Sequence, residues 1–377
     1  HPRALHSFPT RRSSDLDVRL TSQELVLDYH AGYVKTLGRR YGFGLSIEPY
    51  DMNPCADLTL GAVADVPMCE FWSDGYGFDA AFSCIEATSI AHTMGRPIVG
   101  AEAFTAGDAE AWRQHPGSMK NQGDWAFAIG VNRFVYHTFA HQPLGDEHLP
   151  GMTMGPYGVH WDRRQTWWPM ASAYHRYVSR CSHMLRQGTT VSDILYLTPE
   201  GAPHVFRAPA SALQQGSGTL VDKKGYGFDG CSPEILMERA KTVDGSIRFP
   251  EGSSYRLLVL PDVATMTPEL LRKIIDLVKE GATLLGNPPQ KSPSLVNYPQ
   301  CDQEIKTLVQ ELWGGSKWPA GLSERPFGKG RVYWGSACAT LDPSLYPDYD
   351  VAAQILKAMG VAQDFSATGP VRYGHRH

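Results

Sequence analysis

The composition of this chain is that of a soluble globular enzyme, and it excludes several other classes of protein. The 377 residues allow roughly two domains, 42% of them are hydrophobic, and the formal net charge is −4. The basic residues are dispersed, so no nucleic-acid partner is indicated, and no apolar stretch reaches the ~18 residues of a membrane helix. Seven cysteines without a CxxC pair argue against a zinc site or a dense disulfide framework.

The first sixteen residues resemble a translated sequencing adapter. Residues 6–16 read HSFPTRRSSDL, and such a stretch is set aside in fold reasoning, as a cloning scar would be. We therefore expect residues 1–16 to be artificial and disordered, with a natural disordered basic leader as the alternative. No initiator Met or signal peptide is visible, and we expect the chain to be a fragment that lacks its true N-terminal part.

Four short apolar runs in the first half of the chain end in polar residues of catalytic type. In chain order they cover 44–48, 67–72, 98–105 and 133–141. Continuous apolar runs are typical of buried parallel strands. The predicted helices that precede and separate them lie at 21–40, 79–93, 108–114 and 123–129. Thr21 or Ser22 is expected to cap the first of these helices. The alternation predicts a parallel sheet with right-handed crossovers.

These units predict the C-terminal half of a (β/α)8 barrel over residues 17–190. A complete barrel has eight such units, and only about four are present here. The Gly-, Met- and Trp-rich stretch at 142–168 is expected to form an ordered wall of an active site. An amphipathic helix is expected over 170–188.

A second, doubly wound α/β domain is predicted over residues 191–363, followed by a tail at 364–377. Its expected strands are 193–199, 255–261, 282–286 and 330–335, and its expected helices are 267–281, capped by Thr267, and 302–313. Glutamine amidotransferases also have domains of this type and size. Cys231 cannot serve as their nucleophile, because the Ser232-Pro233 that follows it is incompatible with a tight strand-to-helix turn. The domain is therefore predicted to be non-catalytic.

Three glutamates are the candidate reactive groups. Glu102 lies between two small alanines, which leave room for a ligand, and it is the best candidate for a catalytic carboxylate. Glu70 precedes Phe71 and Trp72, and it could act as an acid, orient a ligand or bind a metal. Glu48 lies beside a second acid, as in oxygen-rich sites for hard cations. The alternatives are buried structural glutamates and, for Glu48, an acidic surface turn.

Aromatic and imidazole side chains near the same strand ends are candidates for sugar binding. His137 and His141 are four residues apart, and either could bond a sugar hydroxyl, although a core histidine is the alternative. Two histidines alone do not make a metal site. The aromatic candidates for a carbohydrate platform, any of which could instead belong to the core, are Trp72, Trp125, Trp161, Trp167 and Trp168.

Five longer motifs resemble glycoside hydrolase family 106, the bacterial α-L-rhamnosidases. They are IEPYDMNP at 47–54, ADVPMCEFW at 64–72, GAEAFT at 100–105, YHTFAHQP at 136–143 and PGMTMGP at 150–156. The resemblance extends from about residue 17 to about residue 360. It implies a catalytic (β/α)8 barrel followed by an α/β domain like the one after the barrel in β-galactosidases.

The same resemblance implies an activity and a set of roles. The parent protein would remove terminal α-L-rhamnose from oligo- or polysaccharides with inversion, in the periplasm or outside the cell, with a calcium ion that helps to bind the sugar. Glu102 would activate water, Glu70 and Glu48 would hold calcium or sugar hydroxyls, and the proton donor would lie upstream of residue 17. A non-catalytic carbohydrate-binding protein and a retaining glycosidase for another sugar are the alternatives.

Overall fold

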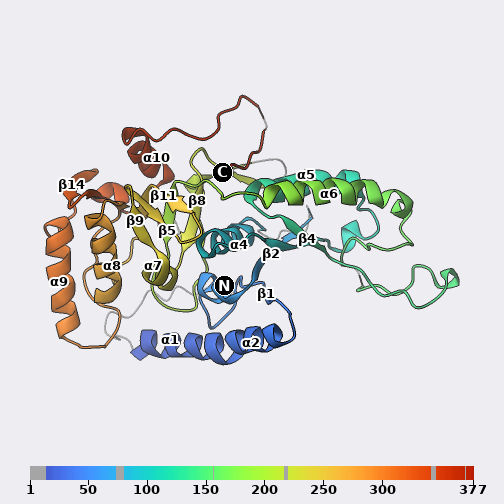
Figure 1. The fold of residues 1–377 in the computed structure, drawn as a ribbon, viewed down its shortest axis with the longest axis horizontal. Helices are drawn as coiled ribbons and strands as arrows, with labels where there is room; N and C mark the ends of the chain where they lie inside the picture. Colours follow the sequence, from blue (N-terminus) through green and yellow to red (C-terminus); the bar gives the residue numbers. More distant parts are fainter. Residues whose placement is uncertain (1–13, 74–79, 156, 216–219, 341–344, 370) are drawn as a thin grey trace.

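The computed structural model describes residues 14–73, 80–155, 157–215, 220–340, 345–369 and 371–377. The chain begins with a long helical rod that runs along one edge of the molecule (Figure 1). The rod consists of α1 (Ser14–Val26), a π-helical turn (Leu27–Ala31) and α2 (Gly32–Arg40). The prediction that Thr21 or Ser22 caps this helix is wrong. Thr21 lies inside α1, where its hydroxyl donates to the carbonyl of Asp17 at 2.8 Å.

The helix also includes the last residues of the adapter-like stretch. Ser14 to Leu16 form the first turn of α1, and the Leu16 side chain is buried. Residues 1–13 lie outside the described residues.

The first sheet is parallel and follows chain order, β1-β2-β3-β4. Its strands are β1 (Ser46–Ile47), β2 (Val66–Trp72), β3 (Gly100–Thr105) and β4 (Arg133–Tyr136). The helices of this half are α3 (Asp57–Val63), α4 (Ala80–Met94), α5 (Pro116–Ile129) and α6 (Ala171–Leu185). The predicted alternation of strands and helices with parallel pairing is confirmed for these four strands.

The two faces of this sheet have different environments. Along β2, Cys69 and Phe71 are fully buried in the core that α4 and α5 help to form, whereas Glu70 and Trp72 are only half-buried. This alternation follows from the two-residue period of a strand. On β4, Val135 is paired in register with Glu102 and is 48% exposed. The face that carries the glutamates is therefore accessible to solvent.

The second sheet is doubly wound, with strand order β14-β15-β13-β12-β5-β8. All neighbouring strands are parallel except the edge pair β14–β15. Its strands are β5 (Ile194–Leu197), β8 (Phe228–Cys231), β12 (Leu257–Val259), β13 (Thr283–Leu285), β14 (Ser323–Phe327) and β15 (Gly330–Trp334). The parallel strands have the flavodoxin-like order 2-1-3-4-5 when numbered along the chain. The predicted doubly wound topology is confirmed, although β8 was not predicted.

Helices and small hairpins complete the second half. The helices are α7 (Pro233–Arg239), α8 (Pro268–Lys279), α9 (Gln300–Trp313) and α10 (Tyr349–Ala358). The additional strands are β6 (Leu213–Gln215), β7 (Val221–Lys223), β9 (Lys241–Val243), β10 (Ser246–Arg248) and β11 (Ser254–Tyr255). Thr267 caps α8 as predicted, since its hydroxyl accepts the amide proton of Leu270 at 3.3 Å. Within the described ranges, no helix combines the length and the apolar character needed to cross a membrane.

Helix α4 and the tail hold the two halves together. His92 of α4 bonds Asp229 of β8, and the tail returns so that Thr190 pairs with Arg376. The amide of Thr189 donates to the carbonyl of His377 at 2.7 Å, and the amide of His377 donates to the carbonyl of Thr189 at 2.8 Å. The tail is thus part of the seam between the two sheets.

Candidate active site

The solvent-accessible face of the first sheet brings Glu70 and Glu102 side by side. The two residues are paired in register on the parallel strands β2 and β3, so their side chains leave the same face of the sheet. The Tyr50 hydroxyl donates to Glu70 Oε2 at 2.5 Å, and the Thr105 hydroxyl donates to Glu102 Oε1 at 2.8 Å. Each carboxylate is therefore oriented by one hydroxyl group.

Glu48 completes a cluster of three carboxylates. It follows β1 directly, and its pKa is raised to about 7 by burial and by the charges of Glu102 and Glu70. Burial also raises the pKa of Glu70, assisted by Glu102 and opposed by hydrogen bonds from Tyr50 and Trp72. Among the described residues, no Lys or Arg contributes to either of these two pKa shifts. The site can therefore hold a proton at neutral pH.

His137 faces this cluster from the third neighbouring strand. It follows β4 directly, and its Nε2 lies 3.8 Å from Glu102 Oε1. Burial lowers the pKa of His137, and the charge of Glu70 opposes that effect only in part. The imidazole is thus favoured in its neutral form, which can both donate and accept a hydrogen bond.

The other predicted site residues lie in different environments. Trp72 ends β2, is half-buried and packs edge-to-face against Tyr157 at a centroid distance of 6.1 Å. His141 is exposed on the loop after β4. Trp125 and Trp161 are buried in the core, so neither can stack on a sugar, and their interpretation as platform residues is wrong. Trp167 also packs against that core.

Sequence reasoning did not identify Tyr50 or Thr105 as functional residues. Both are hydroxyl donors to the predicted glutamates. Thr105 is three residues from Glu102 on the same strand, and that spacing was a readable signal. Tyr50 reaches a glutamate twenty residues away, a pairing that appears only once β1 and β2 are adjacent.

The carboxylates are chemically suited to a calcium ion, but they do not form a preorganised site. Calcium prefers six to eight oxygen ligands. Within the described residues, no group of three His, Cys, Asp or Glu side chains has the spacing to hold a metal ion. Glu70 Oε2 is already bonded to Tyr50. No reaction step is therefore assigned to a metal, and calcium binding stays a prediction.

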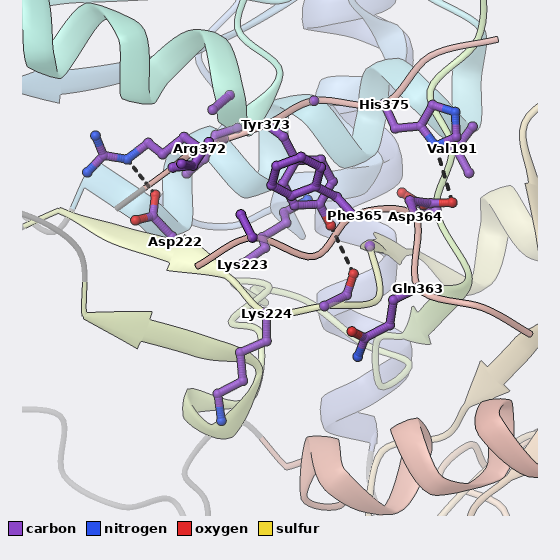
Figure 2. Close-up of a pocket in the computed structure, with 18 of the residues that line it drawn as sticks. Val191, Asp222, Lys223, Lys224, Gln363, Asp364, Phe365, Arg372, Tyr373 and His375 are labelled. Atoms are coloured by element: carbon purple, nitrogen blue, oxygen red, sulfur yellow. Dashed lines mark hydrogen bonds and ion pairs between the residues drawn. The ribbon is translucent and has the colours of Figure 1, made fainter. Parts of the chain in front are cut away.

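A separate cavity lies at the seam between the two halves and the tail (Figure 2). It has a volume of about 290 Å³ and is lined by Lys223, Asp364 and Tyr373, among others. Two pairs of its lining residues are in contact, Arg372 with Asp222 at 2.7 Å and His375 with Asp364 at 3.2 Å. The first pair joins the tail to the hairpin β6–β7, which indicates a structural joint at this place.

Neighbouring carboxylates on an accessible face are the kind of groups that glycoside hydrolysis uses. A model of the α-L-rhamnosidase family matches residues 10–376. The chain therefore belongs to glycoside hydrolase family 106, as its motifs predicted.

Individual relatives agree on the class of enzyme. A protein described as a putative beta-glucuronidase from Formosa agariphila is 38% identical over 299 residues, which cover 79% of this chain and 24% of that protein. The structure of a rhamnosidase from Novosphingobium sp. PP1Y matches with a TM-score of 0.80 and 29% identity, over 97% of this chain and 34% of that one.

More distant structures share the fold alone. A β-galactosidase from Bacillus circulans sp. alkalophilus matches with a TM-score of 0.54 at 12% identity, over 100% of this chain and 63% of its own. The chain spans only about a quarter to a third of the length of the two closer relatives described above.

Proposed function

We propose that this chain is part of an inverting exo-α-L-rhamnosidase, in which the first sheet supplies the last four βα units of a (β/α)8 barrel. The observation that carries the proposal is the register pairing of Glu70 and Glu102 on the accessible face of a parallel sheet, in a member of the rhamnosidase family. The exposed Val135 on the same face is consistent with further strands covering it, because a barrel interior is filled with side chains.

In this proposal Glu102 is the general base. Its carboxylate, held by Thr105, takes a proton from the water that attacks the anomeric carbon, while a proton donor on an earlier unit protonates the leaving oxygen. Inversion requires the two carboxyl groups to be about 6.5–9.5 Å apart, which leaves room for that water. Glu70, His137 and Trp72 hold the sugar, and neutral His137 can bond a hydroxyl group of the sugar.

The relative described as a putative beta-glucuronidase makes a glucuronide the second candidate substrate. A glucuronate carries its own carboxylate, which needs a cationic partner in a binding site. The charges that act on Glu48 and Glu70 come from other glutamates, as far as the described residues extend. Such a cluster repels an anionic sugar, so a neutral deoxy sugar such as rhamnose is favoured.

The test is hydrolysis by the protein at its natural length. We expect turnover of 4-nitrophenyl α-L-rhamnoside and none of 4-nitrophenyl β-D-glucuronide, with the β-anomer of rhamnose appearing first by NMR. Preferred cleavage of the glucuronide would contradict the substrate, and first appearance of the α-anomer would contradict inversion. Sugar binding without product release would favour a non-catalytic carbohydrate-binding protein.

The natural substrates in this proposal are rhamnose-containing oligo- or polysaccharides. Such polymers are encountered outside the cytoplasm, so we propose a periplasmic or extracellular location for the parent protein. Release of rhamnose from a polysaccharide by the secreted fraction of the source culture would test both points.

A further inference from the structure

We propose that Trp112 and His160 form a stacking platform for the sugar to which the cleaved rhamnose is linked. This inference rests on the proposed glycosidase function, and it concerns residues outside the predicted carboxylate site. The two rings are parallel within 11°, with centroids 3.9 Å apart. His160 is buried, with 3% of its surface exposed, whereas Trp112 above it is 39% exposed. His160 thus covers one face of an indole that remains accessible to solvent.

The pair lies beside the candidate active site. The amide of Val159 donates to the carbonyl of His137 at 2.8 Å, which places His160 next to His137, and His137 contributes to the lowered pKa of His160. His137 in turn lies 3.8 Å from Glu102. The contacts run from the predicted catalytic base through two imidazoles to the exposed indole. Two imidazoles thus separate Trp112 from Glu102, and the proposal therefore assigns the indole to the neighbouring sugar rather than to the cleaved one.

Both loops that carry the pair are firmly held. Trp112 lies between Glu110, whose carboxylate bonds Ser73, and Gln114, whose carbonyl accepts from the Trp167 indole at 3.0 Å. On the other loop, the amide of Trp161 donates to the carbonyl of Thr138 at 3.2 Å. The indole and the imidazole therefore sit on fixed supports, as a preorganised binding surface requires.

Gly158 allows the second loop to approach His137 closely. A Cβ atom there would lie 2.7 Å from the carbonyl oxygen of His137, and the residue has φ +91°. Only glycine accepts both conditions without strain.

The arrangement retains three unfavourable features at one place. Trp112 has φ 64° and His160 has φ 53°, values that bulky residues rarely adopt. His160 Nε2 is also buried without a hydrogen-bond partner among the described residues. Strained backbone and unpaired buried groups gather at functional sites, where the surrounding structure holds them in place. A pair that served only to fill the core would not need them. The fixed geometry instead presents a flat aromatic surface, which suits the apolar C–H face of a pyranose ring.

The ligand class is a neutral pyranose in the aglycone position. The side chains that define the surface are one indole and one imidazole whose pKa is lowered by burial and by His137, with Asp162 opposing the shift. A flat ring without a formal charge is the complementary partner. A glucose or galactose unit linked to the rhamnose would fit, and a methyl aglycone would leave the platform empty.

The experiment compares two substrates and three variants in the protein at its natural length. The substrates are methyl α-L-rhamnoside and rutinose, in which rhamnose is linked to glucose. We expect Trp112→Ala to lower the ratio of kcat/KM for rutinose to that for the methyl glycoside by about tenfold, mainly through KM, because one aromatic stacking surface is lost. Trp112→Phe retains a smaller ring and should restore most of the ratio. The control Trp318→Ala removes an indole that is 44% exposed in the second half of the chain, and it should leave the ratio unchanged.

The outcomes separate the platform from the proposed function. Equal losses on both substrates, or no loss on either, would overturn the platform while rhamnoside hydrolysis stands. If the wild-type protein hydrolyses neither compound, calorimetric binding decides. Weaker binding of rutinose by Trp112→Ala, with unchanged binding of methyl α-L-rhamnoside, would support the platform without the activity. Unchanged binding of both sugars would overturn it.

Discussion

Two carboxylate sites in this molecule, one with a single aspartate and one with three glutamates, have opposite electrostatic environments. At the seam, Asp229 is fully buried, and burial alone would raise its pKa. His92 at 2.9 Å, Lys223 and the hydroxyl of Tyr255 at 2.9 Å outweigh burial and hold the pKa below its usual value. On the accessible face of the first sheet, Glu48 and Glu70 are half-buried beside Glu102, and their pKa values are raised by burial and by the charge of Glu102.

The difference separates a structural charge from a reactive one. A buried charge with partners on three sides fixes the joint between two halves of a protein, and removing it leaves those partners uncompensated. Carboxylates that repel each other cost stability and persist where their protonation is used. Substitutions at the seam are therefore expected to lower the free energy of unfolding, whereas substitutions in the glutamate cluster are expected to lower activity.

The largest expected effect is on catalysis at Glu102. Glu102→Gln removes the base but keeps the shape, so kcat on an aryl α-L-rhamnoside should fall about 10³-fold. The free energy of unfolding should be unchanged or slightly higher, because one repelling charge is lost. Steady-state kinetics and urea denaturation measure the two effects. Glu324→Gln, an exposed glutamate paired with Arg331, is the control and should leave kcat unchanged. Near-native activity of the Glu102 variant would contradict the proposal that Glu102 is the general base.

The second effect is on folding at the seam. Asp229→Ala leaves the buried His92 without its carboxylate partner and removes the negative charge that acts on the half-buried Lys223, so it should lower the free energy of unfolding by about 3–5 kcal/mol. Urea denaturation followed by circular dichroism gives this value. Asp244→Ala removes an exposed partner of Arg248 and should cost less than about 0.5 kcal/mol. A loss below about 1 kcal/mol at Asp229 would show that the seam is not held by this charge.

A pair of tyrosine substitutions compares the two sites through the same kind of hydrogen bond, from a tyrosine hydroxyl group to a carboxylate. Tyr255 donates to Asp229 at the seam, and Tyr50 donates to Glu70 at the candidate site. Tyr255→Phe should lower the free energy of unfolding by about 1.5–3 kcal/mol, as expected for a buried hydrogen bond to a charge, and should leave kcat unchanged.

Tyr50→Phe should have the opposite pattern. Solvent can replace its hydroxyl group at a half-buried site, so stability should fall by less than about 1 kcal/mol. Activity should fall about tenfold, because Glu70 loses the donor that orients it. Thermal melting and kinetics of both variants side by side supply the measurement. Equal losses of stability and of activity in the two variants would contradict the distinction between a structural carboxylate at the seam and reactive carboxylates at the candidate site.

The sequence predicted those features of the fold that depend on residues close together in the chain. Thr267 followed by Pro268 is a local helix start, and α8 begins there. The apolar runs predicted the four parallel strands, and because parallel strands end at one edge, they also predicted that Glu70 and Glu102 meet. The fold class and the central pair of glutamates were therefore accessible from residue patterns.

The remaining features depend on contacts that are distant in the chain. Strand β8 was missed because a buried strand with an aspartate at its centre resembles a turn until His92, 137 residues away, is placed beside it. Trp161 resembled a sugar-binding residue because exposure cannot be read from residue type, yet it is 3% exposed. Trp112 was overlooked because the role proposed for it depends on a ring from the loop after another strand.

The smallest effect expected is the contribution of Glu48 to the pH dependence of stability. The pKa of Glu48 is about 7 in the folded protein against an ordinary value of 4.5. Between these values the folded state holds a proton that the unfolded state has released, so stability is greatest below pH 4.5 and decreases as pH rises towards 7. Glu48→Gln cannot ionise and should remove this part of the decline.

The measurement is the difference in Tm between wild type and variant from pH 4.5 to 8, in EDTA so that no cation neutralises the cluster. The difference should grow by only a few degrees with rising pH in favour of the variant. Asp57 and Asp193, whose pKa values are also raised, contribute equally to both proteins and cancel. Because the pKa of Asp229 is lowered, that group contributes the opposite slope at lower pH. A constant difference across the range would mean that Glu48 ionises normally and that the cluster is not under electrostatic strain.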